Sequence, residues 1–133
     1  MATIRKEIPL HASPDDVWDV LRDVGAIHTR LTPGFVVDTR LEHDARIVTF
    51  ANGQVVRELI VNVDNDSRRL AYAVVGGTAK HHNASFQALP NTNGGTSLVW
   101  ITDILPDTVA PAFTAMIDAG ASVIKHTLDR PPA

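Results

Sequence analysis

Two titratable residues, Glu58 and His82, stand in apolar segments of the sequence and could carry acid–base chemistry. Glu58 lies in a run rich in valine and isoleucine, and His82 has the same strand parity as Ala84 and Phe86. Burial of a carboxylate in an apolar cavity raises its pKa, and a histidine can hold or release a proton near neutral pH. Such a pair could serve as general base and acid in an enolisation, an aldol cyclisation or a dehydration.

The same two residues admit a structural interpretation. Glu58 could form an ion pair with a nearby arginine, and His82 could donate one hydrogen bond to a ligand or a water molecule. Structural ion pairs perturb pKa values as functional ones do, so composition alone does not separate the two hypotheses. If both side chains face one enclosed space, we expect their titrations to be coupled.

Metal, thiol and cofactor chemistry find no support in the sequence. The six histidines show neither HxxxH nor HExxH spacing, and the chain has no cysteine. His81 and His82 are adjacent in an expected strand, so their side chains point to opposite faces and cannot share one ion. We therefore expect no metal site and no cofactor.

Length and charge restrict the class of protein. The 133 residues are 44% hydrophobic, and 12 Lys and Arg against 15 Asp and Glu give a net charge of −3. This length predicts one domain, residues 1–133, with its own core. A mildly acidic chain does not favour nucleic acid as a partner. No apolar run approaches the roughly 20 residues of a membrane span, and the start of the sequence lacks a secretory signal, so we expect a cytoplasmic protein.

Hydrophobic periodicity and turn residues predict an α+β domain. Ser13-Pro14 begins a helix that Gly25 can end, residues 26–31 form a second short helix, and a long helix runs from near Pro111 to Arg130-Pro131-Pro132. Between the short helices and the long one, turn signals separate segments rich in valine, isoleucine and threonine. Their short connections indicate an antiparallel meander. The predicted strands are residues 3–10, 35–42, 45–51, 54–63, 68–75, 79–89 and 96–105.

The order of the predicted elements, together with five motifs, resembles that of the START-like superfamily, also called SRPBCC or helix-grip proteins. Within it, the chain resembles the polyketide cyclase/dehydratase and lipid-transport-like branch. The resemblance covers the whole chain and implies a seven-stranded antiparallel sheet wrapped around a long C-terminal helix, with two short helices after the first strand. The motifs are Ser13-Pro14-Asp15-Asp16-Val17-Trp18, Arg57-Glu58, Asp64 with Arg68-Arg69-Leu70-Ala71-Tyr72, Val75-Gly76-Gly77, and Gly95-Thr96-Ser97-Leu98-Val99-Trp100 before Asp103.

The fold that this resemblance implies leaves a ligand cavity between the sheet and the long helix. Small residues of that helix could mark the widest part of the cavity, or could simply permit close packing; they are Ala115, Ala119, Gly120 and Ala121. The turn at Gly76-Gly77 could gate the cavity, and His28 and Arg30 could lie at its mouth, although a solvated Arg30 is the alternative. The predicted ligand-binding residues are Glu58, Ile60, Tyr72, His82, Phe86, Trp100, Phe113, Met116, Ile117 and Gly120.

The inward face of strand 54–63 is where periodicity and resemblance disagree. Hydrophobic alternation favours one face as inward, namely Val55, Leu59, Val61 and Val63 together with Arg57. The resemblance instead places Glu58 inside with Val56 and Ile60, and we follow it. The expected cavity then holds few charged groups and no arginine.

We therefore predict a protein that binds a small hydrophobic or aromatic molecule in an internal cavity. Acid–base chemistry of the cyclase/dehydratase type at Glu58 and His82 is one form of this hypothesis, and a non-catalytic carrier or sensor is the other. A third is a homodimeric interaction module that uses Leu59, Val61 and Val63 on its outer face.

Overall fold

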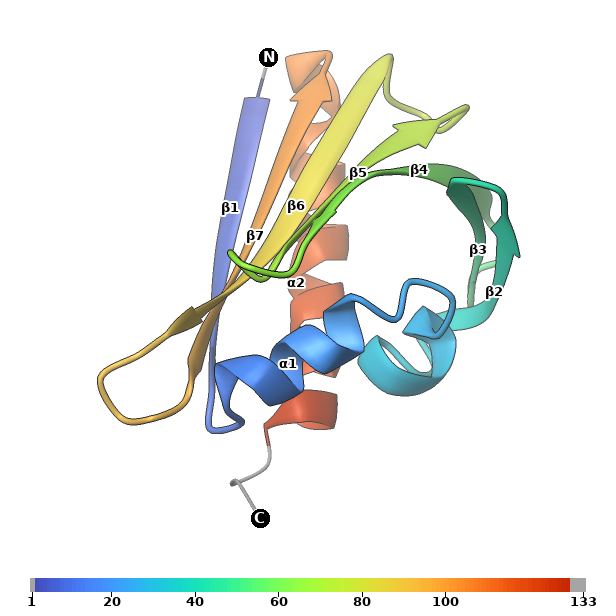
Figure 1. Ribbon diagram of the computed structural model, residues 1–133. Coiled ribbons are helices and arrows are strands. Elements are labelled where there is room, and N and C mark those ends of the chain that lie inside the picture. Colours follow the sequence, from blue (N-terminus) through green and yellow to red (C-terminus); the bar gives the residue numbers. More distant parts are fainter. Residues whose placement is uncertain (1, 130–133) are drawn as a thin grey trace.

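A curved antiparallel sheet wraps around one long helix in the computed structural model, which describes residues 2–129 (Figure 1). The seven strands follow the order β1-β7-β6-β5-β4-β3-β2, so the predicted α+β helix-grip fold is confirmed. Each predicted strand lies within two residues of the observed one. The strands are β1 (Ala2–Leu10), β2 (Val36–Glu42), β3 (Ala45–Phe50), β4 (Val55–Asp64), β5 (Arg69–Val75), β6 (His81–Pro90) and β7 (Thr96–Leu105).

The first helix, α1 (Pro14–Leu21), begins where its sequence predicts. The Ser13 hydroxyl accepts a hydrogen bond from the Asp16 backbone N–H at 3.2 Å, and Pro14 occupies the first turn, where no N–H is needed. The helix ends four residues before the predicted Gly25. The predicted second helix is a single π-helical turn, η1 (Ile27–Leu31).

The long helix α2 (Ala110–Leu128) lies against the concave face of the sheet, after a short 3-10 turn, η2 (Asp107–Val109) (Figure 1). It buries Ile117 and Ile124 there. The predicted stop at Arg130-Pro131-Pro132 lies outside the described residues. None of the described helices is long and apolar enough to cross a membrane.

A β-bulge at Val61 decides which side chains of β4 face inward. Ile60 pairs with Tyr72, but Asn62 pairs with Ala71, so Val61 is an extra residue in the ladder. Before the bulge Glu58 is buried, whereas Val61 itself is 64% exposed. The face chosen from the resemblance is therefore confirmed, and the one chosen from hydrophobic alternation is wrong. Use of the outer face as a dimer interface stays a prediction.

Candidate ligand-binding cavity

A partly open cavity with a volume of ≈ 90 Å³ lies between the concave face of the sheet and α2. Eight of the ten predicted site residues line it; they are Glu58, Tyr72, His82, Phe86, Trp100, Phe113, Met116 and Ile117. Of the described residues, Ile60 and Gly120 belong to the predicted set but not to this lining. Ile60 is the last residue before the bulge and packs against the core instead.

The small residues of α2 do not widen the cavity, contrary to the first of the two expectations. A Cβ atom at Gly120 would stand 3.3 Å from Trp100 Cη2 and 3.5 Å from Phe35 Cε2. Ala115 and Ala119 are exposed on the far side of the helix. Gly120 thus allows α2 to approach the Trp100 ring closely, which is the packing interpretation.

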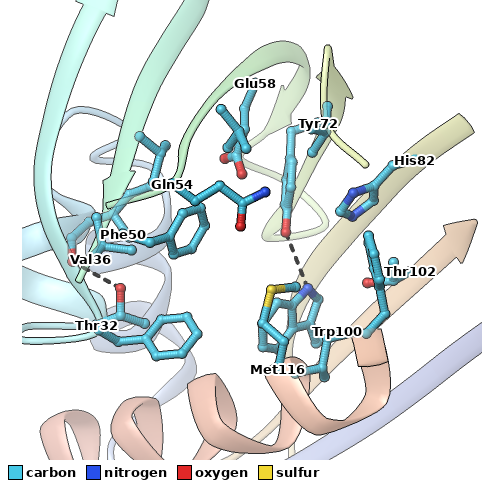
Figure 2. A pocket seen from close by; sticks show the side chains of 18 of the residues that line it. Thr32, Val36, Phe50, Gln54, Glu58, Tyr72, His82, Trp100, Thr102 and Met116 are labelled. Carbon is cyan, nitrogen blue, oxygen red and sulfur yellow. Dashed lines mark hydrogen bonds between the residues drawn. The ribbon is translucent and has the colours of Figure 1, made fainter. Parts of the chain in front are cut away.

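Three aromatic rings from adjacent strands form the floor of the cavity. Phe86 stacks on Trp100 with centroids 4.7 Å apart and on Tyr72 with centroids 6.3 Å apart. The Trp100 indole N–H donates a hydrogen bond to the Tyr72 hydroxyl oxygen at 3.3 Å (Figure 2). Burial, and then the negative charge of Glu58, raise the pKa of Tyr72, so its hydroxyl keeps its hydrogen at neutral pH.

A buried ion pair lies in the wall beside this floor. Arg46 Nε donates to Glu58 Oε1 at 2.8 Å, and the two side chains are only 4% and 9% exposed. Arg46 Nη1 also donates to the Val24 carbonyl at 3.4 Å, and the guanidinium carbon lies 5.1 Å from the centre of the Tyr72 ring. Glu58 therefore has the arginine partner of the structural interpretation.

Arg46 is a charged lining residue that was not predicted from the sequence, since no arginine was expected in the cavity. Treating Asn52-Gly53 as a two-residue turn would place Ile47 opposite Glu58. The turn holds a third residue, with Gly53 at φ +91°, and the register shifts so that Arg46 pairs with Glu58. A three-residue loop with glycine in the left-handed region is thus the signal that could have found it.

His82 lies on the far side of the cavity floor from Glu58. Its ring meets Phe113 edge-on with centroids 5.1 Å apart. Burial, and then the charge of His81, lower its pKa from 6.5 to about 4, so the imidazole is neutral at neutral pH.

Glu58 and His82 line one cavity without touching. Glu58 lies on β4 and His82 on β6, and β5 runs between these strands, so about 10 Å of sheet separates their backbones. Figure 2 shows Tyr72 between them. Coupled titration of the two residues stays a prediction.

Some residues near the predicted mouth line the cavity, and others form ion pairs at the surface. Gly77 and Thr78 line the cavity, and the Gln54 carboxamide points into it (Figure 2). Arg30 instead pairs with Asp19 at 2.8 Å and Asp23 at 2.9 Å, joining η1 to α1. This is the surface role of Arg30, and gating by the Gly76-Gly77 turn stays a prediction.

The curved sheet, the long helix and the apolar space between them define a helix-grip ligand-binding protein. The sequence matches the family described as polyketide cyclase / dehydrase and lipid transport over residues 1–130, and the chain belongs to that family. Among the described residues no cluster suited to a metal ion is present.

Solved structures share this fold at low sequence identity. The protein XoxI from Bacillus cereus is 17% identical over 96% of both chains, with a TM-score of 0.85. A Thermobifida fusca protein is 24% identical over 95% of this chain and 89% of its own, with a TM-score of 0.77. A Thalictrum norcoclaurine synthase, solved with a transition-state analogue, is 23% identical over 94% and 95%, with a TM-score of 0.61. No curated protein matched the sequence.

Proposed function

We propose that this protein binds a small, uncharged aromatic or apolar molecule in its cavity and acts as a carrier or sensor. The observation that carries the proposal is a cavity with an aromatic floor whose charged lining groups neutralise each other. Arg46 and Glu58 neutralise each other, and His82 carries no charge at neutral pH. A ligand with a net charge would lose its hydration and gain no free counter-charge, so an uncharged one is favoured.

The size and shape of the cavity support a flat, compact ligand. At roughly 10–15 Å³ for each water-sized group, ≈ 90 Å³ holds about six to nine such groups. That is the scale of a substituted single ring. The stacked rings of Tyr72, Phe86 and Trp100 offer a planar surface on which such a ring can lie.

Binding without chemistry is favoured over catalysis by the state of His82. With a pKa of about 4, its imidazole holds no proton to give as a general acid at neutral pH and is a weak base. The Glu58 carboxylate is already engaged by Arg46. The pKa of His82 is therefore far from the near-neutral value that acid–base catalysis uses best.

Acid–base chemistry of the cyclase or dehydratase type is the second candidate. It draws support from Glu58 and His82 lining one cavity on either side of Tyr72. A bell-shaped dependence of rate on pH that is lost in both Glu58→Gln and His82→Gln would favour this candidate over the carrier. Any turned-over substrate would serve for that measurement.

Two measurements test the binding proposal. Native mass spectrometry of the freshly purified protein is expected to show a co-purified small molecule. An NMR titration with para-cresol is expected to give saturable shifts at cavity residues in the wild type. Met116→Trp, which fills the cavity, should weaken this binding at least about tenfold through steric exclusion.

The neighbouring Ala115→Trp is the matched control, because Ala115 is exposed on the outside of the same helix. It should bind para-cresol as the wild type does. Equal binding by the wild type and by Met116→Trp would contradict the proposal, as would the absence of saturable shifts in the wild type.

A further inference from the structure

We infer that the Arg46–Glu58 pair selects a neutral ring compound carrying a hydroxyl group, of the phenol type, and rejects the matching carboxylate. The inference rests on the proposed binding function and names the chemical class of its ligand. It depends on which hydrogen-bonding atoms of the wall are already used and which remain for a ligand.

The cation of the pair is already engaged. Arg46 donates from Nε to Glu58 and from Nη1 to the Val24 carbonyl, and its guanidinium lies over the Tyr72 ring. Its side chain is 4% exposed. These two bonds use two of its five N–H groups, and a carboxylate that approached the others would bring a second negative charge beside Glu58.

The anion of the pair keeps one oxygen for a ligand. Glu58 Oε1 accepts from Arg46, whereas Oε2 accepts no hydrogen bond from any of residues 2–129. Glu58 lines the cavity, and Figure 2 shows its carboxylate turned toward the interior. An ionised carboxylate only accepts, so the group that it can bind is a donor, and charge-assisted hydrogen bonds of this kind are strong.

The Tyr72 hydroxyl supplies the complementary group. Its oxygen accepts from Trp100, and its hydrogen has no acceptor within the described part of the chain. Tyr72 pairs with Ile60, two residues along β4 from Glu58, so the two side chains lie on one face of neighbouring strands, and Figure 2 shows the Gln54 carboxamide between them. A hydroxyl group can either donate to Glu58 or accept from Tyr72, whereas a methyl group can do neither and a carboxylate only the second.

Three para-substituted toluenes of the same ring size test the inference: para-cresol, para-xylene and para-toluate. At pH 7 the phenol keeps its hydrogen and the toluate is charged. In NMR titrations of the wild type, para-cresol is expected to bind about tenfold more tightly than para-xylene, the effect of one charge-assisted hydrogen bond. Para-toluate is expected to bind most weakly.

Glu58→Gln tests the selection directly, because it leaves Arg46 without its counter-charge. The order of the probes should then invert, with para-toluate binding more tightly than para-cresol. Tyr72→Phe is the matched control: it removes one hydroxyl and no charge, so it should weaken para-cresol several-fold without admitting para-toluate. If Glu58→Gln does not fold, the neutral double variant Arg46→Gln/Glu58→Gln replaces it, and it should abolish the preference for para-cresol over para-xylene.

The outcomes separate the inference from the function on which it rests. Equal binding of all three probes to the wild type, or rejection of para-toluate by Glu58→Gln, overturns the phenol selection and leaves cavity binding intact. Saturable binding of none of the three overturns both. Inversion of the order in Glu58→Gln, together with its absence in Tyr72→Phe, supports the selection.

Discussion

Acidification should destabilise the folded protein through His82. The pKa of this residue falls from 6.5 to about 4 on folding, mainly because burial disfavours the imidazolium and secondarily because of His81. Above pH 6.5 the side chain is neutral in both states, and its stability contribution is fully present. Between pH 6.5 and 4 the unfolded chain binds a proton that the folded protein does not, so the free energy of unfolding decreases as the pH falls.

The magnitude follows from the same two pKa values. The difference between these pKa values corresponds to a decrease in the free energy of unfolding of about 3 kcal/mol well below pH 4 and of about 2 kcal/mol at pH 5. The imidazole is only half-buried, and solvent screening reduces such terms, so we expect roughly 1 kcal/mol at pH 5.

Urea unfolding at pH 7.5 and pH 5 measures this contribution. The wild type should lose about 1 kcal/mol more than His82→Gln between the two pH values, because glutamine takes up no proton. His126→Gln controls for the loss of one histidine, since His126 is exposed and does not line the cavity. If His82→Gln changes the pH dependence no more than His126→Gln does, the reasoning about His82 is refuted.

Three further predictions concern the cavity wall and floor. Arg46→Met and Glu58→Leu should each lower the free energy of unfolding by about 3–5 kcal/mol, because each leaves a buried charge unpaired. The double variant leaves none and should lose much less. A double-mutant cycle in urea measures this difference, and additive losses would contradict it. Gly120→Trp should cost about 1–3 kcal/mol or more through overpacking against Trp100, and a thermal midpoint equal to that of the wild type would count against it. Ligand binding should still change the tryptophan fluorescence of Trp18→Phe but not that of Trp100→Phe, since only Trp100 lines the cavity; a response that survives in Trp100→Phe would place the ligand elsewhere.

The order of strands and helices could be predicted because most of the chain agrees with its local signals. Alternation and turn residues place every strand to within two residues, and Ser13-Pro14 begins α1 as predicted. The end of α1 could not be predicted, because the chain leaves the helix at Leu21 without glycine. Gly25 instead lies against the Leu41 side chain, where a Cβ would stand 3.1 Å away.

The inward face of β4 needed information beyond periodicity. Val55 and Val61 look like core residues, yet they are 56% and 64% exposed, while the charged Glu58 is buried. Hydrophobic alternation follows the apolar residues alone, so it cannot show that Glu58 is buried because Arg46 pairs with it. The bulge at Val61 adds a local change of register that no alternation rule contains.

The Arg46–Glu58 pair could be predicted only from the correct pairing of β3 with β4. Arg46 becomes visible only when the loop around Gly53 is counted as three residues, which changes its partner in β4. Gly120 was misassigned for a different reason. A small residue marks either space or close approach, and only the position of the Trp100 ring distinguishes the two.

The ion pair in the cavity wall also constrains how this chain can evolve. Loss of one partner leaves a buried charge unpaired, whereas loss of both does not. We therefore expect Arg46 and Glu58 to be kept or lost together. Lineages that keep one are expected to keep the other, and lineages that lose them should replace both with apolar residues. A change of ligand class from neutral to anionic would then pass through a poorly folded intermediate, unless a second mutation first supplies Arg46 with another partner.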